Sequence, residues 1–227
     1  AGGAGRGPDA IIPLHRFQQR GLRLGSMITV GNQANLGTDD AIAALLDDDR
    51  VTAIGLFLEA VRDAQQSAVR DDLRRILEAS RPEVVYLHNL ADKHDTHVGC
   101  TLRCIEAIRQ MPKADRPKMV YGCEVWRDLD WMVDSDKVAL DAGRHPELAL
   151  ELLKVFDSQV TGGKRYDLAT MGRRSAHATY HTSHATDRVT GITWAMDLTP
   201  LVSNPALSLE EFTLSYIRRL QDDVQAR

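Results

Sequence analysis

The segment richest in side chains that can do chemistry covers residues 88–97 and reads HNLADKHDTH. It holds three histidines and two aspartates within ten residues. His94 and His97 are three residues apart where a helix is expected to begin, so their imidazoles can converge on one point. Imidazole is a good zinc ligand, although a catalytic zinc takes three protein ligands and a water. The segment indicates metal or acid–base chemistry; the alternative that Asp95 or Thr96 only caps the helix stays open.

Strands and helices alternate around this segment. Strands are expected over residues 26–30, 51–58, 83–87, 118–121 and 190–198, and helices over residues 39–46, 63–80, 96–108, 146–156 and 209–220. This alternation predicts an α/β, Rossmann-like fold with a mostly parallel sheet covered by helices on both faces. The histidine-rich loop leaves the strand 83–87 at its carboxyl end, where ligands bind in such sheets.

Composition restricts the class of protein. The chain has 227 residues, 43% of them hydrophobic, which is enough for a sizeable core. Its net charge of −4 argues against a nucleic-acid binder. No apolar run approaches the ~20 residues that cross a bilayer, and the Gly-rich start does not resemble a secretory signal. Three sparse cysteines favour a reducing compartment, so we expect a cytoplasmic protein without a membrane partner.

Two weaker groups of residues also deserve a chemical interpretation. Lys164 and Arg165 follow two glycines, but this is not a Walker A sequence. Together with Arg173, Arg174 and His184 they are candidate cations for a sugar or sugar phosphate, with a solvated basic helix face as the alternative.

The second group extends the histidine pair toward the cysteines. His94, His97, Cys100 and Cys104 have a spacing that permits a closed four-ligand zinc site. Cysteines on a helix are more commonly small buried hydrophobes, and that alternative stays open as well.

Longer motifs carry a resemblance. In chain order these motifs read VVYLHNLADKHDTHVGCTLRCIEAIR, YGCEVWRDLDW, DSQVTGGKRYDLATMGRR and AMDLTPL. From about residue 62 onward they resemble the later part of PIG-L (LmbE-like) zinc-dependent N-deacetylases. The resemblance implies a zinc ligand at His97 and an acid or electrophile at His94, with Asp92 and Asp95 as further catalytic candidates. The family's first motif, Ala-His-Pro-Asp-Asp-Glu, which supplies two ligands and the general base, does not occur in this sequence.

The start of the chain resembles a different family. This segment reads GLRLGSMITVGNQANLGTDDAIAALLDDDRVTAIGLFLEAV. It is similar to part of the succinyl-CoA-synthetase-like domain of nucleoside-diphosphate-forming acyl-CoA ligases. In that family a glutamate like Glu59 helps to hold a phosphohistidine. We therefore expect a flexible lead-in at residues 1–20, an acyl-CoA-ligase-like α/β fragment at 21–62 and a deacetylase-like domain at 63–227, the last two packed as one unit.

Together these patterns predict a zinc-dependent hydrolase that removes acetyl from an N-acetylated amino sugar, with that sugar as its small-molecule partner. Two alternatives stay open. One is a catalytically silent α/β module, because the first metal motif is missing. The other is an acyl-CoA-ligase-like fragment that binds CoA or a partner subunit. Self-association into a homo-oligomer stays open too.

Overall fold

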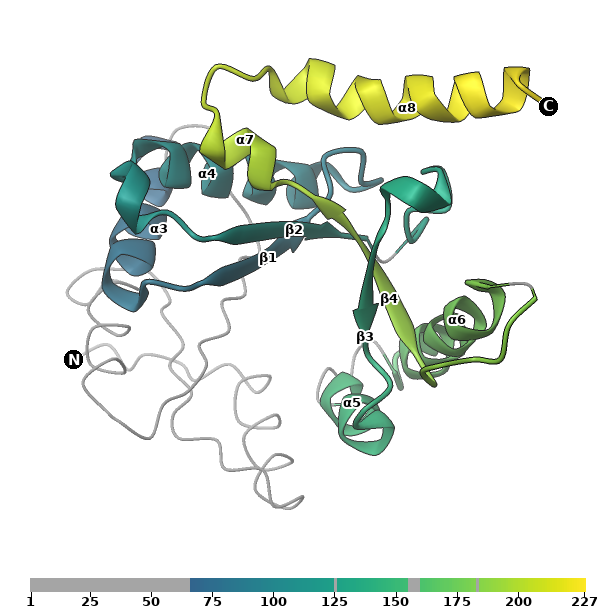
Figure 1. Ribbon diagram of the computed structural model, residues 1–227. Helices are drawn as coiled ribbons and strands as arrows, with labels where there is room; N and C mark the ends of the chain where they lie inside the picture. Colours follow the sequence, from purple (N-terminus) through teal and green to yellow (C-terminus); the bar gives the residue numbers. More distant parts are fainter. Residues whose placement is uncertain (1–65, 125, 155–159, 183) are drawn as a thin grey trace, which may run out of the picture. The chain divides into compact units, whose positions relative to one another are not determined.

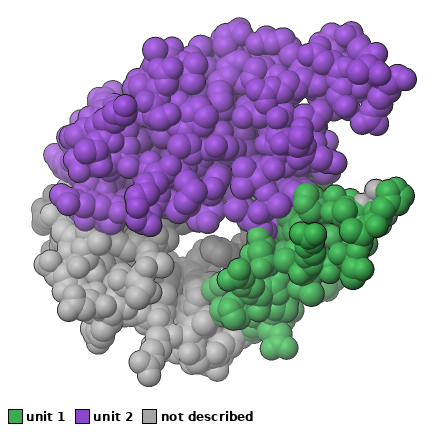
Figure 2. Space-filling view, in the orientation of Figure 1, with its two compact units in different colours: residues 1–37, 47–52, 141–192 green, residues 38–46, 53–140, 193–227 purple. Residues whose placement is uncertain are grey.

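The computed structural model describes residues 66–124, 126–154, 160–182 and 184–227. The predicted elements at 26–30, 39–46 and 51–58, the lead-in, the 21–62 fragment and Glu59 lie outside the described residues. Among the described residues the chain forms two compact units (Figure 2): one includes 141–192, and the other includes 66–140 and 193–227. We call them unit 1 and unit 2.

Unit 2 contains the sheet and the helices that follow its strands (Figure 1). Its elements in chain order are α3 (Gln66–Ser80), β1 (Val84–His88), α4 (Asp95–Gln110), β2 (Met119–Cys123), β3 (Val138–Asp141), β4 (Ile192–Asp197), α7 (Thr199–Ser203) and α8 (Leu209–Gln225), with short 3-10 turns at Lys113–Asp115 and Asp134–Asp136. The ends of β3 and β4 reach the boundary with unit 1. Of the described residues, unit 1 contributes α5 (Pro146–Leu153) and α6 (Tyr166–Tyr180).

The four strands form one sheet in the order β1-β2-β4-β3. β1 and β2 are parallel, with Val84 opposite Met119 and His88 opposite Cys123, whereas β4 runs antiparallel to β2. The predicted α/β, Rossmann-like class is confirmed. The parallel arrangement holds for β1 and β2, the pair that carries the histidine-rich loop.

The core of unit 2 lies where α4 and α7 meet the sheet. α4 packs against β1 and α7, and α7 packs against β2, so these helices lie on one side of the β1–β2 pair (Figure 1). The side chains that fill this space are almost fully buried and include Ile105, Ile108, Val120, Leu198 and Leu201. Burial of such side chains stabilises each by about 1.5–3 kcal/mol, which fixes α4 relative to β1.

An arginine fastens the end of α4 to the segment that follows β4. Arg116 donates from Nη1 to the carbonyl of Val202 at 2.8 Å, from Nη2 to the carbonyl of Arg109 at 2.8 Å and from Nε to the carbonyl of Met111 at 3.0 Å. Arg109 in turn donates to the carbonyls of Leu201 and Leu207. Helix C-termini leave carbonyls without partners, and these guanidinium groups satisfy them.

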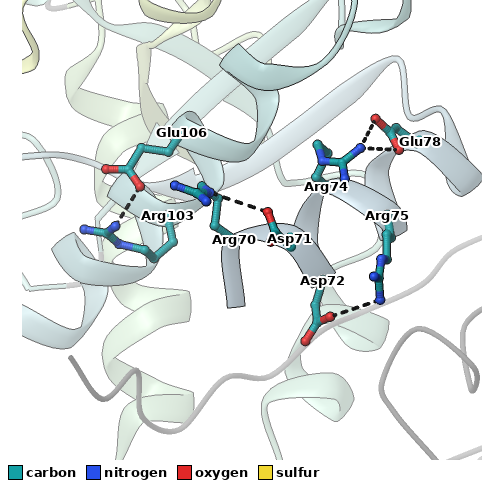
Figure 3. Close-up of polar contacts among 8 residues, drawn as sticks. All are labelled: Arg70, Asp71, Asp72, Arg74, Arg75, Glu78, Arg103 and Glu106. Atoms are coloured by element: carbon teal, nitrogen blue, oxygen red, sulfur yellow. Dashed lines mark hydrogen bonds and ion pairs between the residues drawn. The ribbon is translucent and has the colours of Figure 1, made fainter. Parts of the chain in front are cut away.

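α3 lies beside α4 and presents a charged face (Figure 3). Leu73, Ile76 and Leu77 are buried on its inner side. On its other side Arg74 pairs with Glu78 through two contacts of 2.8 and 3.0 Å, one turn further along the helix. Pairs one helical turn apart, such as this partly exposed one, contribute only about 0.3–0.5 kcal/mol, so the apolar side decides where α3 lies.

The described residues contain no helix long and apolar enough to cross a membrane. Cys100, Cys104 and Cys123 are free thiols.

Candidate functional site

The site is built at the point where β1 ends and α4 begins. Thr101 of α4 donates to the carbonyl of His88 at 2.9 Å and so ties the last residue of β1 to the helix. The Asn89 amide N–H donates to the carbonyl of Cys123 at the end of β2, also at 2.9 Å. The carboxyl ends of two parallel strands and the start of a helix are thereby held together, which is the usual location of ligand sites in such sheets.

The loop between β1 and α4 is shaped by its own side chains. The buried Asn89 accepts a hydrogen bond from the Ala91 amide through Oδ1, at 2.7 Å. Asp92 accepts one from the His94 amide, also through Oδ1, at 2.8 Å. Both are local bonds to a backbone N–H two residues on, typical of Asn and Asp in turns. The second turn directs the Asp92 carboxylate inward beneath the first turn of α4.

Three side chains meet in this loop, and we call them the histidine–aspartate cluster: His88, Asp92 and His97. Each offers one atom that can bind a metal, and these atoms lie within 4.8 Å of one another. His97 Nδ1 is 3.1 Å from Asp92 Oδ1. The rings of His88 and His97 are stacked, with centroids 3.9 Å apart and an angle of 7° between their planes.

The cluster is largely shielded from water. The Asp92 side chain is 0% exposed, whereas that of His97 is 28% exposed. Burial lowers the pKa of His88, and the neighbouring His97 lowers it further, although Asp92 opposes the shift. The neutral form of His88 is thus favoured, and neutral imidazole is the form that accepts protons and binds metals.

His94 lies beside the cluster without being part of it. Its ring is exposed and lies 5.1 Å from the His97 ring and 4.9 Å from the Trp126 ring, measured between centroids. His94 is the N-cap residue of α4, with an extended backbone and no capping hydrogen bond from its side chain. Asp95 begins the helix and is exposed, as is Lys93, whose Nζ lies 5.6 Å from the centre of the Trp126 ring.

Of the four residues predicted in this segment, the structure brings together Asp92 and His97, with His94 next to them and Asp95 on the surface. Sequence reasoning did not select His88 as a site residue. The signal was its place directly after the predicted strand 83–87, four residues before Asp92.

The cysteine alternative finds no support in the geometry. The candidate metal group within the described residues contains neither Cys100 nor Cys104. Burial raises the pKa of both thiols, that of Cys104 to about 12, whereas metals bind the thiolate. These cysteines pack as small hydrophobes along α4.

The basic side chains predicted to bind substrate all belong to unit 1. Arg165 is the N-cap residue of α6 and forms two contacts with the buried Asp167, at 3.0 and 2.9 Å. Lys164 is exposed, with Nζ 6.0 Å from the centre of the Tyr166 ring. Arg173 and Arg174 lie on α6 and are half-buried, and His184 is exposed.

Comparison with known proteins corrects the main functional prediction. A family model described as a succinyl-CoA ligase like flavodoxin domain matches residues 7–98, less than half of the chain. No curated protein and no solved structure matches. No PIG-L family model matches. The resemblance to that family is therefore wrong, and so is the prediction of a zinc-dependent hydrolase that removes acetyl from an amino sugar.

The physical reason for this error lies in the motif. A polar loop between a strand and a helix occurs throughout α/β folds, and a fold of this kind does not define one chemistry. The match also reaches residue 98, past the boundary expected near residue 62, and so includes β1, the loop and the first turn of α4. The acyl-CoA-ligase alternative is the one that the comparison favours.

Proposed function

We propose that this chain is an acyl-CoA-ligase-like module that binds a phosphate group of its substrate at the N-terminus of α4. The observation that carries the proposal is the match of residues 7–98 to the succinyl-CoA ligase like domain, because it includes the loop and the helix start described above. Ligases that form nucleoside diphosphates handle phosphate on the nucleotide, on an acyl phosphate and on CoA. A phosphate-binding surface is therefore what such a module needs.

The start of α4 has the electrostatics for an anion. The first backbone N–H groups of a helix have no partner within the helix and lie at the positive end of its dipole. In α4 the His94 side chain makes no capping hydrogen bond to them. A phosphate at a helix N-terminus is stabilised by these N–H groups directly.

Exposed side chains on both sides of this helix start adjust the affinity in opposite directions. Lys93 and His94 are exposed immediately before α4 and present donors to an incoming oxyanion. Asp95, in the first turn, carries a like charge and opposes an anion. The balance of these three side chains predicts moderate affinity that depends on ionic strength.

Calorimetric titration of the full chain with four ligands tests the proposal. Inorganic phosphate and acetyl phosphate probe the phosphate group alone. CoA and pantetheine share the pantetheine arm, but only CoA carries phosphate groups. We expect CoA to bind more tightly than pantetheine. Comparing CoA with acetyl phosphate identifies which phosphate compound the module prefers.

Three variants locate the site. Lys93→Ala should weaken binding of the preferred phosphate compound roughly two- to tenfold, the value of one hydrogen bond. Asp95→Asn should strengthen it, because a like charge is removed. Lys113→Ala is the matched control, since it removes an exposed lysine just beyond the opposite end of α4 and should change nothing. Equal binding of CoA and pantetheine, or equal loss in Lys93→Ala and Lys113→Ala, would contradict the proposal.

A further inference from the structure

We propose that the histidine–aspartate cluster of His88, Asp92 and His97 binds one divalent transition-metal ion of the zinc class. The proposal goes beyond phosphate binding at α4 and does not depend on it. It starts from the three ligand atoms, which lie within 4.8 Å of one another on a single short segment.

The buried carboxylate of Asp92 favours a cation at this position. Asp92 is 0% exposed through its side chain, and its Oδ1 accepts the His94 amide. Its Oδ2 is buried and has no hydrogen-bond partner. A buried carboxylate oxygen without a partner is costly, and a cation removes that cost. The orphaned oxygen belongs to the same side chain that contacts His97.

The contact between His97 and Asp92 has the geometry of two ligands of one ion. His97 Nδ1 lies 3.1 Å from Asp92 Oδ1, yet Nδ1 makes no hydrogen bond, because the ring N–H direction does not meet the oxygen. Two ligand atoms bound to one zinc at ~2.0–2.2 Å lie roughly 3.0–3.4 Å from each other. The separation fits two ligands of one ion, and the lack of a hydrogen bond leaves His97 Nδ1 available to that ion.

The third ligand, His88, is held in place by its backbone. The Thr101 hydroxyl fixes its carbonyl, and its ring stacks on that of His97. The ring lone pairs of stacked imidazoles lie in parallel planes, so one ring must tilt for both to meet an ion. Both side chains are only half-buried, which leaves room for that rotation.

The ligand types select the ion. Two imidazoles and one carboxylate suit zinc, cobalt, iron or nickel, whereas magnesium and calcium prefer oxygen ligands. Three protein ligands leave at least one coordination position for water or for a substrate oxygen, which is typical of catalytic rather than structural zinc sites.

The test is titration of the metal-free full chain with Zn²⁺ by calorimetry and with Co²⁺ by visible absorption, in buffer without phosphate. We expect one ion per chain and the intense d–d bands of four- or five-coordinate cobalt, with no displacement by Mg²⁺. His88→Ala, His97→Ala and Asp92→Asn should each weaken binding at least ~tenfold. The asparagine amide oxygen still accepts the His94 N–H, so this variant keeps the loop.

His145→Ala is the matched control, because His145 is an exposed histidine that precedes α5 and makes no capping bond from its side chain. It should bind metal like the wild type. Circular dichroism confirms that each variant is folded. Absence of stoichiometric binding, displacement by Mg²⁺, or unchanged affinity in folded Asp92→Asn and His97→Ala would overturn the proposal. Because no phosphate is present, failure here leaves phosphate binding at α4 to its own test.

Discussion

Replacement of Gly122 by alanine tests whether the strands hold the site as described. A Cβ at this position would lie 3.0 Å from the Asn89 Cα, 3.1 Å from the His88 carbonyl oxygen and 2.9 Å from Leu198 Cδ1. Carbon atoms in contact normally lie ~3.5–4.0 Å apart. The leucine methyl can rotate away, but the two backbone atoms belong to the loop that carries the cluster and cannot.

The expected cost follows from these distances. Forcing an extra methyl into a packed core costs about 1–3 kcal/mol. Loss of glycine's freedom in the unfolded chain returns about 0.4–1 kcal/mol. The free energy of unfolding should therefore fall by about 1–2 kcal/mol. At roughly 2–4 °C per kcal/mol for a chain of this size, the Tm should fall by ~2–8 °C.

Thermal and urea unfolding followed by circular dichroism measures the effect. The matched control is Gly99→Ala, since Gly99 lies within α4 and a Cβ there meets nothing within 4 Å. Alanine in a helix interior should stabilise by about 0.5–1 kcal/mol. If Gly122→Ala raised the Tm as Gly99→Ala does, the loop backbone would not pack against β2, and the account of the site would be refuted.

Two further predictions concern the same unit. Arg116→Ala should lower the free energy of unfolding by about 2–3 kcal/mol, because three carbonyls lose a charged donor. Arg103→Ala, which loses one ion pair with Glu106, should lower the free energy of unfolding by at most ~1 kcal/mol. If urea unfolding showed equal losses for Arg116→Ala and Arg103→Ala, the role of Arg116 in holding the three carbonyls would be contradicted. Burial raises the pKa of Cys123 to about 11 and that of Cys104 to about 12, so at pH 8 roughly a thousandth or less of each thiol is ionised. Iodoacetamide labelling followed by mass spectrometry should modify Cys100 first and accelerate with rising pH; faster labelling of Cys104 would contradict its burial.

Much of the fold was predictable because its elements have periodic apolar residues. The strand expected at 83–87 is β1, and the helix expected at 96–108 is α4, each displaced by only one or two residues. β3 was missed because it has four residues, too few to show alternation. α6 was missed because its start has no capping signal: its N-cap residue is Arg165, which makes no capping hydrogen bond from its side chain. The antiparallel direction of β4 has no signal in the sequence, since direction depends on the connections between strands.

The site was predictable in location but not in composition. His94 and His97 were expected to converge because they are three residues apart at the entry of the helix. His94 has φ −98° and ψ 122°, so it precedes the first helical residue and the three-residue spacing does not bring its ring onto the helix face. Asp92 reaches His97 instead, because the His94 amide donates to Asp92 Oδ1 and the loop bends there. Such a turn is local, but sequence periodicity does not report that it brings the Asp92 carboxylate to His97.

The resemblance to deacetylases shows the limit of short motifs. It was based on a strand, a polar loop and a helix in order, together with several short stretches further along the chain. The matched ligase-like segment extends through the same strand and loop to residue 98. A strand, polar loop and helix in this order occur in folds with unrelated functions, so the motif alone did not separate the two families.

The most direct test of the proposed function is an NMR titration of the full chain with CoA and with acetyl phosphate. The account predicts that the largest amide shifts occur at Asp95, Thr96 and His97, whose N–H groups open α4, and that pantetheine leaves them unchanged. Shifts centred instead on Lys164 and Arg165, or no shifts with either phosphate compound, would contradict a phosphate site at the start of α4.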